Sequence, residues 1–213
     1  MLTSMPIPMF AEAAGVTYVV PVAIGTARFR KLSFSMRILS ILCALALLEV
    51  IFLRYVGHLK IKNYFISQFY TALEVSFIHA VYFAAESSTA RKRMIGGLGI
   101  GFFLIWLGAT LFSHGQQQMG GWMSVVARIF LIAASLLAFQ SLMADARTRL
   151  LESSLFWMVI AVILYSAGSM VTIGVSDMLL KTNYWQLYVV YHINWSLLIV
   201  ANMLYSKALL CKS

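Results

Sequence analysis

The fold of this chain is decided by the stretch "YVVYHINWSLLIVANMLY", residues 188–205. It is long and apolar enough to cross a bilayer, yet it contains His192, Asn194 and Asn202. On an α-helix the aliphatic residues fall on one side and the polar and aromatic residues on the other. The stretch therefore predicts a membrane helix with one face toward lipid and one toward other helices. The polar-aromatic face comprises Tyr188, Tyr191, His192, Asn194, Trp195, Asn202 and Tyr205. The segment near 64–86 has the same pattern, with Gln68, Glu74 and His79 on one side and Phe69 and Phe83 on the other, so we expect the two segments to face a common interior.

The rest of the chain repeats this apolar pattern. Of its 213 residues, 62% are hydrophobic and 11% are charged, whereas an ordinary soluble domain has about 25% charged residues. Such a composition favours lipid as the solvent. No alternating barrel pattern occurs, so the apolar segments are expected to be helices. We predict an all-α polytopic membrane protein, a single domain spanning 1–213, with seven transmembrane helices near 9–27, 38–57, 64–86, 95–113, 122–144, 154–176 and 184–206.

The positions of lysine and arginine predict the orientation in the membrane. Most of them follow the first, third and fifth apolar segments or lie in the C-terminal tail. By the positive-inside rule the N-terminus lies outside and the C-terminus in the cytoplasm. The net charge of +9 is thereby explained without a nucleic-acid partner, and we expect a multi-pass protein of the bacterial inner (plasma) membrane. The cytoplasmic basic residues are Arg28, Arg30, Lys31, Arg37, Arg91, Lys92, Arg93, Arg147, Arg149, Lys207 and Lys212.

The sequence does not predict an enzyme, a cofactor or a metal site. All loops are short, and no metalloprotease, nucleophile-elbow or phosphate-loop motif occurs. Cys43 and Cys211 have no metal-ligand spacing and are not expected to form a disulfide. The last segment lacks a central lysine for a retinal Schiff base. His79 and His192 could suggest a haem pair, but their depths differ, and a histidine satisfied in the core is the favoured interpretation.

Two carboxylates and one guanidinium fall in one layer, in the outer half of the apolar segments or near the midplane: Glu49, Glu74 and Arg128. A charge at that depth costs roughly 2.5–3.5 kcal/mol unless it is paired or hydrated. We therefore expect Arg128 to pair with Glu74 or Glu49, with the remaining carboxylate protonated or hydrated. One interpretation is a polar pocket open to the outside; the alternative is hydrogen bonding that only holds helices together, worth about 0.6 kcal/mol per contact. The candidate ligand-binding residues are Glu74, Arg128, His192, Asn194, Glu49 and Tyr188.

A second group of polar residues lies toward the cytoplasmic side. The run "ARKR" at 90–93 is basic and is expected to attract anionic lipid. The small residues of "GGLGIG" at 96–101 favour close helix packing. The candidates for coupling to a partner are Asn202, His79, Arg91, Lys92 and Arg93.

Several stretches resemble one family. They are "LFWMVIAVILYSAGSM" at 155–170 with "YHINWSLLIVANMLY" after it, "FYTALEVSF" at 69–77, and the basic "RFRKLS". Together they are similar to an uncharacterised seven-transmembrane-helix inner-membrane protein family common in Bacteroidetes. The resemblance implies seven helices, no attached enzyme and a sensory role with a separate kinase or similar partner. It supplies no established ligand, and only Glu74, His192, Asn194 and Asn202 match characteristic positions.

Three functions remain open from the sequence. The first is a receptor-like signalling module that binds a small ligand in an outward-facing pocket and acts through a cytoplasmic or membrane partner, with homo-oligomers possible. The second is a small-solute transporter, which a weak internal echo favours: "NYFISQFYTALEV" from Asn63 resembles "NYWQLYVVYHINW" from Asn183. The third is a structural subunit of a membrane complex.

Overall fold

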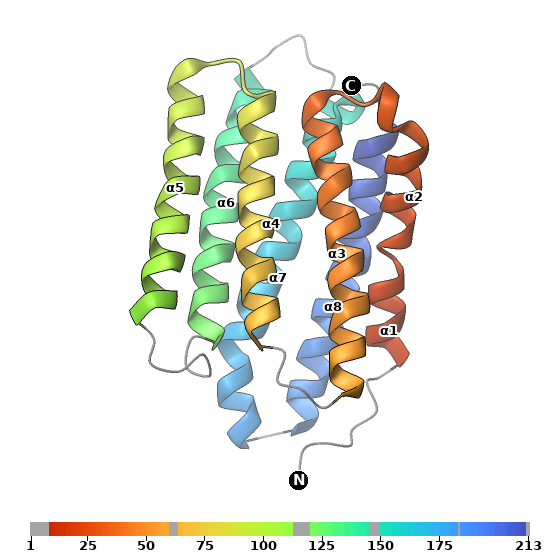
Figure 1. Cartoon of the computed structure of the whole chain (residues 1–213), viewed down its shortest axis with the longest axis vertical. Coiled ribbons are helices and arrows are strands. Elements are labelled where there is room, and N and C mark those ends of the chain that lie inside the picture. Colours follow the sequence, from red (N-terminus) through yellow and green to blue (C-terminus); the bar gives the residue numbers. More distant parts are fainter. Residues whose placement is uncertain (1–8, 60–63, 113–119, 145–149, 183, 212–213) are drawn as a thin grey trace.

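The computed structural model describes residues 9–59, 64–112, 120–144, 150–182 and 184–211, and these form a helical bundle without any strand (Figure 1). The all-α prediction is confirmed. Successive long helices run in alternating directions along the bundle, and the N- and C-termini lie at opposite ends. The α-helices are α1 (Met9–Val16), α2 (Val19–Arg28), α3 (Phe34–His58), α4 (Tyr64–Ala85), α5 (Thr89–Phe112), α6 (Gly120–Ala144), α7 (Ser154–Thr182) and α8 (Tyr184–Leu210), with 3-10 turns η1 (Phe29–Lys31) and η2 (Leu150–Glu152).

The first segment is broken between α1 and α2, at Thr17 and Tyr18. The break lies one turn before Pro21 because a proline ring clashes with the carbonyl four residues earlier and has no N–H to donate to it. That carbonyl belongs to Thr17, and it accepts instead from the backbone N–H of Val20 at 3.2 Å. The break turns Tyr18 toward the middle of the bundle, where it lines a cavity.

Six segments of the described chain are long and apolar enough to cross a membrane, which is typical of a multi-pass membrane protein. Helix α4 is not among them. It is 22 residues long but carries Gln68, Glu74 and His79, which lower its mean hydropathy. The six segments are Phe10–Lys31, Phe34–His58, Thr89–Leu111, Gly121–Ala144, Ser154–Ser176 and Tyr188–Leu210.

Helix α4 places its polar face against its neighbours α3, α5 and α6. Gln68, Glu74 and His79 are each at most 8% exposed, whereas Phe69 and Phe83 on the opposite side are each 48% exposed. The two-faced pattern predicted from the sequence is therefore correct. A helix of this kind can lie in a membrane because protein, and not lipid, covers its polar side.

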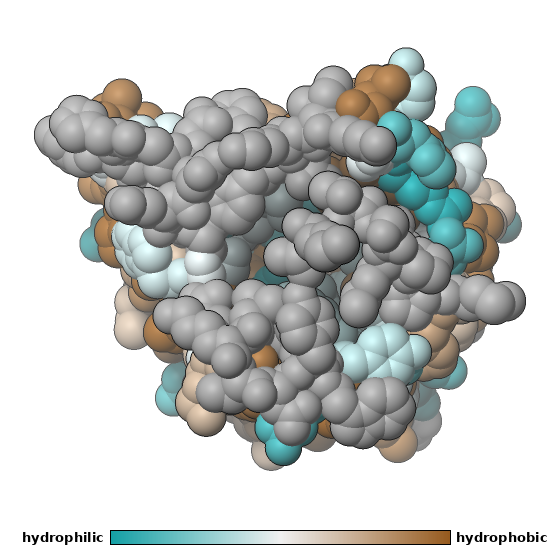
Figure 2. Space-filling view, turned by 90° about the horizontal axis from the view of Figure 1, so that it is seen from below, coloured by the Kyte–Doolittle hydropathy of each residue, from teal (hydrophilic) through white to brown (hydrophobic). Residues whose placement is uncertain are grey.

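The circumference of the bundle is hydrophobic. Seen from the lower end, hydrophobic residues appear around the rim of the molecule (Figure 2). Among the described residues, large aliphatic side chains that are more than half exposed include Leu48, Ile100, Leu111 and Met178. On a soluble protein such an exposed surface would drive association, whereas in a bilayer it faces acyl chains.

Close helix contacts depend on glycine at Gly25 of α2, where a Cβ would overlap Ser40 of α3, and at Gly168 of α7. A Cβ at Gly99 of α5 would make only an ordinary contact, 3.4 Å from the ring of His79 on α4. A Cβ at Gly168 of α7 would overlap the side chain of Leu197 on α8. Gly99 belongs to the "GGLGIG" run, in which the sequence predicts close packing, whereas Gly97 of the same run has nothing within 4 Å.

Candidate functional site

The centre of the bundle contains a buried ion pair. Arg128 Nη1 of α6 donates to Glu74 Oε1 of α4 at 2.9 Å, and each side chain is only 10% exposed. The Arg128 Cζ atom also lies 4.9 Å from the centroid of the Tyr165 ring on α7, a cation–π distance. The predicted pairing of Arg128 is thus confirmed, with Glu74 as its partner.

Glu49 of α3 is the second carboxylate of this region. It is half-buried and lies within electrostatic range of both Glu74 and Arg128. When all three groups are ionised, two carboxylates and one guanidinium leave one excess negative charge. The prediction that the unpaired carboxylate is protonated or hydrated stays a prediction.

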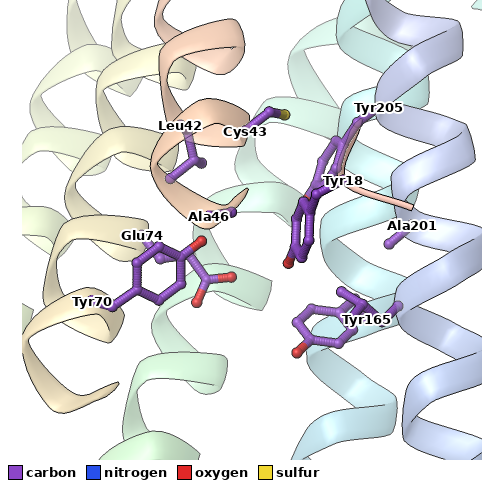
Figure 3. A pocket seen from close by; sticks show the side chains of 10 residues that line it. Tyr18, Leu42, Cys43, Ala46, Tyr70, Glu74, Tyr165, Ala201 and Tyr205 are labelled. Atoms are coloured by element: carbon purple, nitrogen blue, oxygen red, sulfur yellow. The ribbon is translucent and has the colours of Figure 1, made fainter. Parts of the chain in front are cut away.

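A small cavity adjoins the ion pair on the side away from α6. Its volume is about 20 Å³, which is enough for roughly one water molecule. Tyr70 and Glu74 lie on one side of it, and Tyr18, Tyr165 and Tyr205 lie on the other (Figure 3). The remaining wall is apolar and comprises Leu42, Cys43, Ala46, Leu198 and Ala201.

The four tyrosines are not among the predicted site residues. Tyr205 falls on the inward face predicted for the last helix, and the cavity confirms that α4 and α8 face a common interior. For Tyr70 and Tyr165 the available signal was a tyrosine in the middle of an apolar segment. For Tyr18 no such signal existed, because its place depends on the break between α1 and α2.

His192 belongs to a different cluster, in the N-terminal half of α8, which the sequence predicts to be the outer half. Its ring centroid lies 5.3 Å from that of Phe10 on α1, 4.0 Å from that of Tyr188 and 5.1 Å from that of Trp195. Its Nδ1 atom lies 2.9 Å from the Tyr188 carbonyl oxygen. We call Phe10, Tyr188, His192 and Trp195 the outer aromatic cluster.

The outer aromatic cluster is separate from the ion pair. No contact within the described ranges joins His192 to Glu74 or Arg128. Tyr188 is 43% exposed, and the Oδ1 atom of half-buried Asn194 is enclosed without a partner in the part of the chain described. The structure thus does not bring His192, Asn194 and Tyr188 into one pocket with the ion pair, and their role in ligand binding stays a prediction.

Two of the predicted inner polar residues are buried between helices. Asn202 of α8 is fully buried, and its Nδ2 atom donates to Thr17 Oγ1 at 2.8 Å, at the break between α1 and α2. His79 Nδ1 lies 2.8 Å from the Val75 carbonyl oxygen, and the residue is 5% exposed. Neither can touch a partner surface directly, so coupling through them would act by helix packing.

The basic turn between α4 and α5 is organised by Glu86. Its carboxylate accepts from the backbone N–H groups of Ser87 at 3.0 Å and Ser88 at 2.8 Å, and pairs with Arg91 Nε at 3.1 Å. Burial raises the pKa of the Glu86 carboxyl, but its hydrogen bonds to Ser88 and to Arg91 lower it further, and the net pKa lies below its usual value.

The other two basic residues of this turn are arranged differently. Lys92 Nζ lies 5.8 Å from the centroid of the Phe83 ring. Arg93 is exposed. Of the three predicted basic candidates, Arg93 is therefore the most accessible to a partner or a lipid headgroup.

No group of three or more histidine, cysteine, aspartate or glutamate side chains able to hold a metal ion occurs in the described ranges. Cys43 and Cys211 are both free. Comparison of the chain with protein-family models, with curated proteins and with solved structures gives no match. The site must therefore be interpreted from its own chemistry.

Proposed function

We propose that this protein is a seven-span sensor of the bacterial inner membrane, with its N-terminus outside. A small ligand binds beside the Glu74–Arg128 ion pair and shifts the helices against a signalling partner. The observation that carries the proposal is the ion pair itself, enclosed by α4, α6 and α7 and adjoining a cavity with polar walls.

The ion pair is unlike ordinary packing. Replacing a buried ion pair by hydrophobic residues of similar volume is often neutral or stabilising. Ionisable residues inside a membrane are expensive, and they commonly mark ligand or ion pathways. Helix packing alone would need neither Glu74 nor Arg128, so a functional role accounts for them better.

The size of the cavity couples binding to motion. Its walls come from the α1–α2 junction and from α3, α4, α7 and α8. A volume of about 20 Å³ admits nothing larger than a water molecule or an ion of that size. Any larger ligand must separate these helices, so its binding favours a conformation in which they stand apart.

The signal would reach the partner at the basic cytoplasmic end of the bundle. Arg93 at the start of α5 is exposed, and the Glu86–Arg91 pair fixes the turn that joins α5 to α4. A displacement of α4 at Glu74 is therefore transmitted directly to this turn. The partner would contact the turn, and two copies of the chain could present two such turns.

The test is a distance measurement across the cytoplasmic end. Spin labels are placed at Thr89→Cys and Lys207→Cys in a background without Cys43 and Cys211, and the protein is reconstituted in lipid nanodiscs. We expect a small-molecule filtrate of yeast extract to change the distance distribution in the wild-type background. The change should be lost in Glu74→Gln, and an unchanged distribution in every fraction of the filtrate would refute the sensor.

A transporter is the second candidate, favoured by the three ionisable groups Glu49, Glu74 and Arg128 in one region. Net uptake of a labelled solute into proteoliposomes, abolished by Glu74→Gln, would establish transport. A filtrate fraction that changes the distance distribution without any net uptake would establish the sensor.

A further inference from the structure

We propose that the tyrosine-lined cavity binds an ammonium group, either as the free ion or as the head of a small primary amine. This inference rests on the site of the proposed function and names its ligand class. Three observations carry it: the charge balance, the hydroxyl groups without partners, and the aromatic walls.

The charge balance favours a cation. Glu49 and Glu74 face one guanidinium, that of Arg128, and each of the two carboxylates is within electrostatic range of the tyrosines of the cavity. Another described ion pair, Glu12–Arg54 at 3.4 Å, is exposed and balanced. When Glu49 is ionised, the two carboxylates and the one guanidinium leave one excess negative charge, which in surroundings of low dielectric constant attracts one monovalent cation.

The hydroxyl groups of the tyrosines that line the cavity need hydrogen-bond partners. A buried tyrosine hydroxyl is nearly always bonded, as Tyr82 is to Ser135 Oγ at 2.8 Å. No hydrogen bond of the Tyr18, Tyr70, Tyr165 and Tyr205 hydroxyls occurs within the described part of the chain; Tyr205 is buried and the other three are half-buried. Tyr205 is only 9% exposed. An ammonium group donates up to four hydrogen bonds, so it can satisfy phenol oxygens and the Glu74 carboxylate together.

The aromatic walls favour nitrogen cations. Ring faces attract ammonium and guanidinium groups, and Arg128 already uses the Tyr165 ring in this way at 4.9 Å. An ammonium ion is about the size of a water molecule and thus fits about 20 Å³. A primary amine would place its ammonium group there and displace the apolar wall of Leu198 and Ala201 with its carbon chain.

The test is ligand-dependent stability in nanodiscs, which have no interior in which ammonia could change the pH. Tm is measured at constant ionic strength in chloride salts of sodium, potassium, ammonium, methylammonium and tetramethylammonium. We expect Tm to rise with ammonium and methylammonium concentration, because a ligand that binds the folded state alone stabilises it. Sodium and potassium should give no such rise, and tetramethylammonium, which has no N–H group, should give none.

Variants separate the contributions without breaking the ion pair. Glu49→Gln removes the excess negative charge and should weaken the apparent affinity for ammonium by about tenfold or more. Tyr165→Phe keeps the ring and removes one hydroxyl, and it should weaken ammonium binding less than Glu49→Gln does. Tyr191→Phe is the matched control, because Tyr191 stacks on Trp195 of α8 and does not line the cavity.

Several outcomes would overturn the inference. They are a Tm that does not change with ammonium concentration, an equal rise of Tm in sodium or potassium, or a Tm response to ammonium that Glu49→Gln leaves unchanged. The proposed function fails separately. If ammonium stabilises the wild type while the spin-label distances never change, the cavity holds a structural cation and the protein is not a sensor. If distances respond to the filtrate but ammonium has no effect, the sensor stands and its ligand is not an amine.

Discussion

The ion pair and the outer aromatic cluster each contain an ionisable side chain of a long helix, but in different surroundings. Glu74 and Arg128 come from two helices, lie 2.9 Å apart and are each 10% exposed. His192 contacts rings of its own helix and of α1, beside Tyr188, which is 43% exposed. The difference shows that a polar face on a long helix becomes an enclosed polar interior only where several other helices close over it. The predictions below test this contrast.

The largest effect is expected from breaking the ion pair. Glu74→Gln leaves the Arg128 guanidinium buried without a counter-ion, which costs about 3–5 kcal/mol. The double variant Glu74→Leu/Arg128→Leu should recover most of this loss or all of it. Both are measured as the free energy of unfolding in mixed micelles. A single variant as stable as the wild type would mean that water already hydrates Arg128.

A third carboxylate sharpens the contrast, because Glu86 is buried but lies outside the helices. Glu86→Gln should cost about 1–2 kcal/mol at neutral pH through its bonds to Ser88 and Arg91. Since its folded pKa is lowered, this stabilisation is present above the unfolded pKa of about 4.3 and is lost as pH falls through the folded pKa. The stability difference between wild type and Glu86→Gln should therefore shrink on acidification, and a constant difference from neutral to acidic pH would contradict it.

A smaller loss is expected at the buried amide of α8. Asn202→Leu removes the hydrogen bond to Thr17 Oγ1, and one such contact between membrane helices is worth about 1 kcal/mol. Thermal unfolding should show a modest fall in Tm. If Tm rises instead, Asn202 is kept at a cost in stability and belongs to a site.

The smallest effects are expected in the outer part of α8. His192→Leu and Asn194→Leu should each change the free energy of unfolding by less than about 0.5 kcal/mol, or stabilise slightly, because neither side chain bonds another helix. Thermal melts beside Asn202→Leu provide the comparison. A loss as large as that of Asn202→Leu would show that the outer aromatic cluster holds α8 in place.

Most of the fold was predictable because the apolar character of each long helix is a property of its own segment of sequence. Each predicted segment corresponds to observed helix, and the largest boundary differences are those of α5, which begins at Thr89, and α7, which ends at Thr182. Helix α5 starts before its apolar stretch and α7 continues past its apolar stretch. The backbone stays helical through polar residues, which hydrophobicity alone excludes from a predicted segment. The number of crossings and the orientation stay predictions, since lengths and compositions alone do not test them.

The site was predictable only in part. The cost of burying charge forced Arg128 to have an acidic partner, and helix periodicity placed Glu74 inward. Whether Arg128 pairs with Glu49 or with Glu74 depends on how α4 and α6 are packed. The cavity depends on four tyrosines from distant parts of the chain, a combination that no local pattern contains. His192 was grouped with the ion pair because both faces point inward on a helical wheel, which carries no information about which neighbour each face meets.

The separation of Glu74 and Arg128 along the chain matters for how the protein is made. They are 54 residues apart, so the ribosome adds Glu74 to the chain roughly 3–11 s before Arg128, at a rate of about 5–20 residues per second. Throughout that interval Glu74 has no guanidinium to neutralise it. Helix α4, which carries Gln68, Glu74 and His79, must therefore wait at the insertion machinery or enter the lipid with Glu74 protonated, and its stable integration depends on a helix synthesised later.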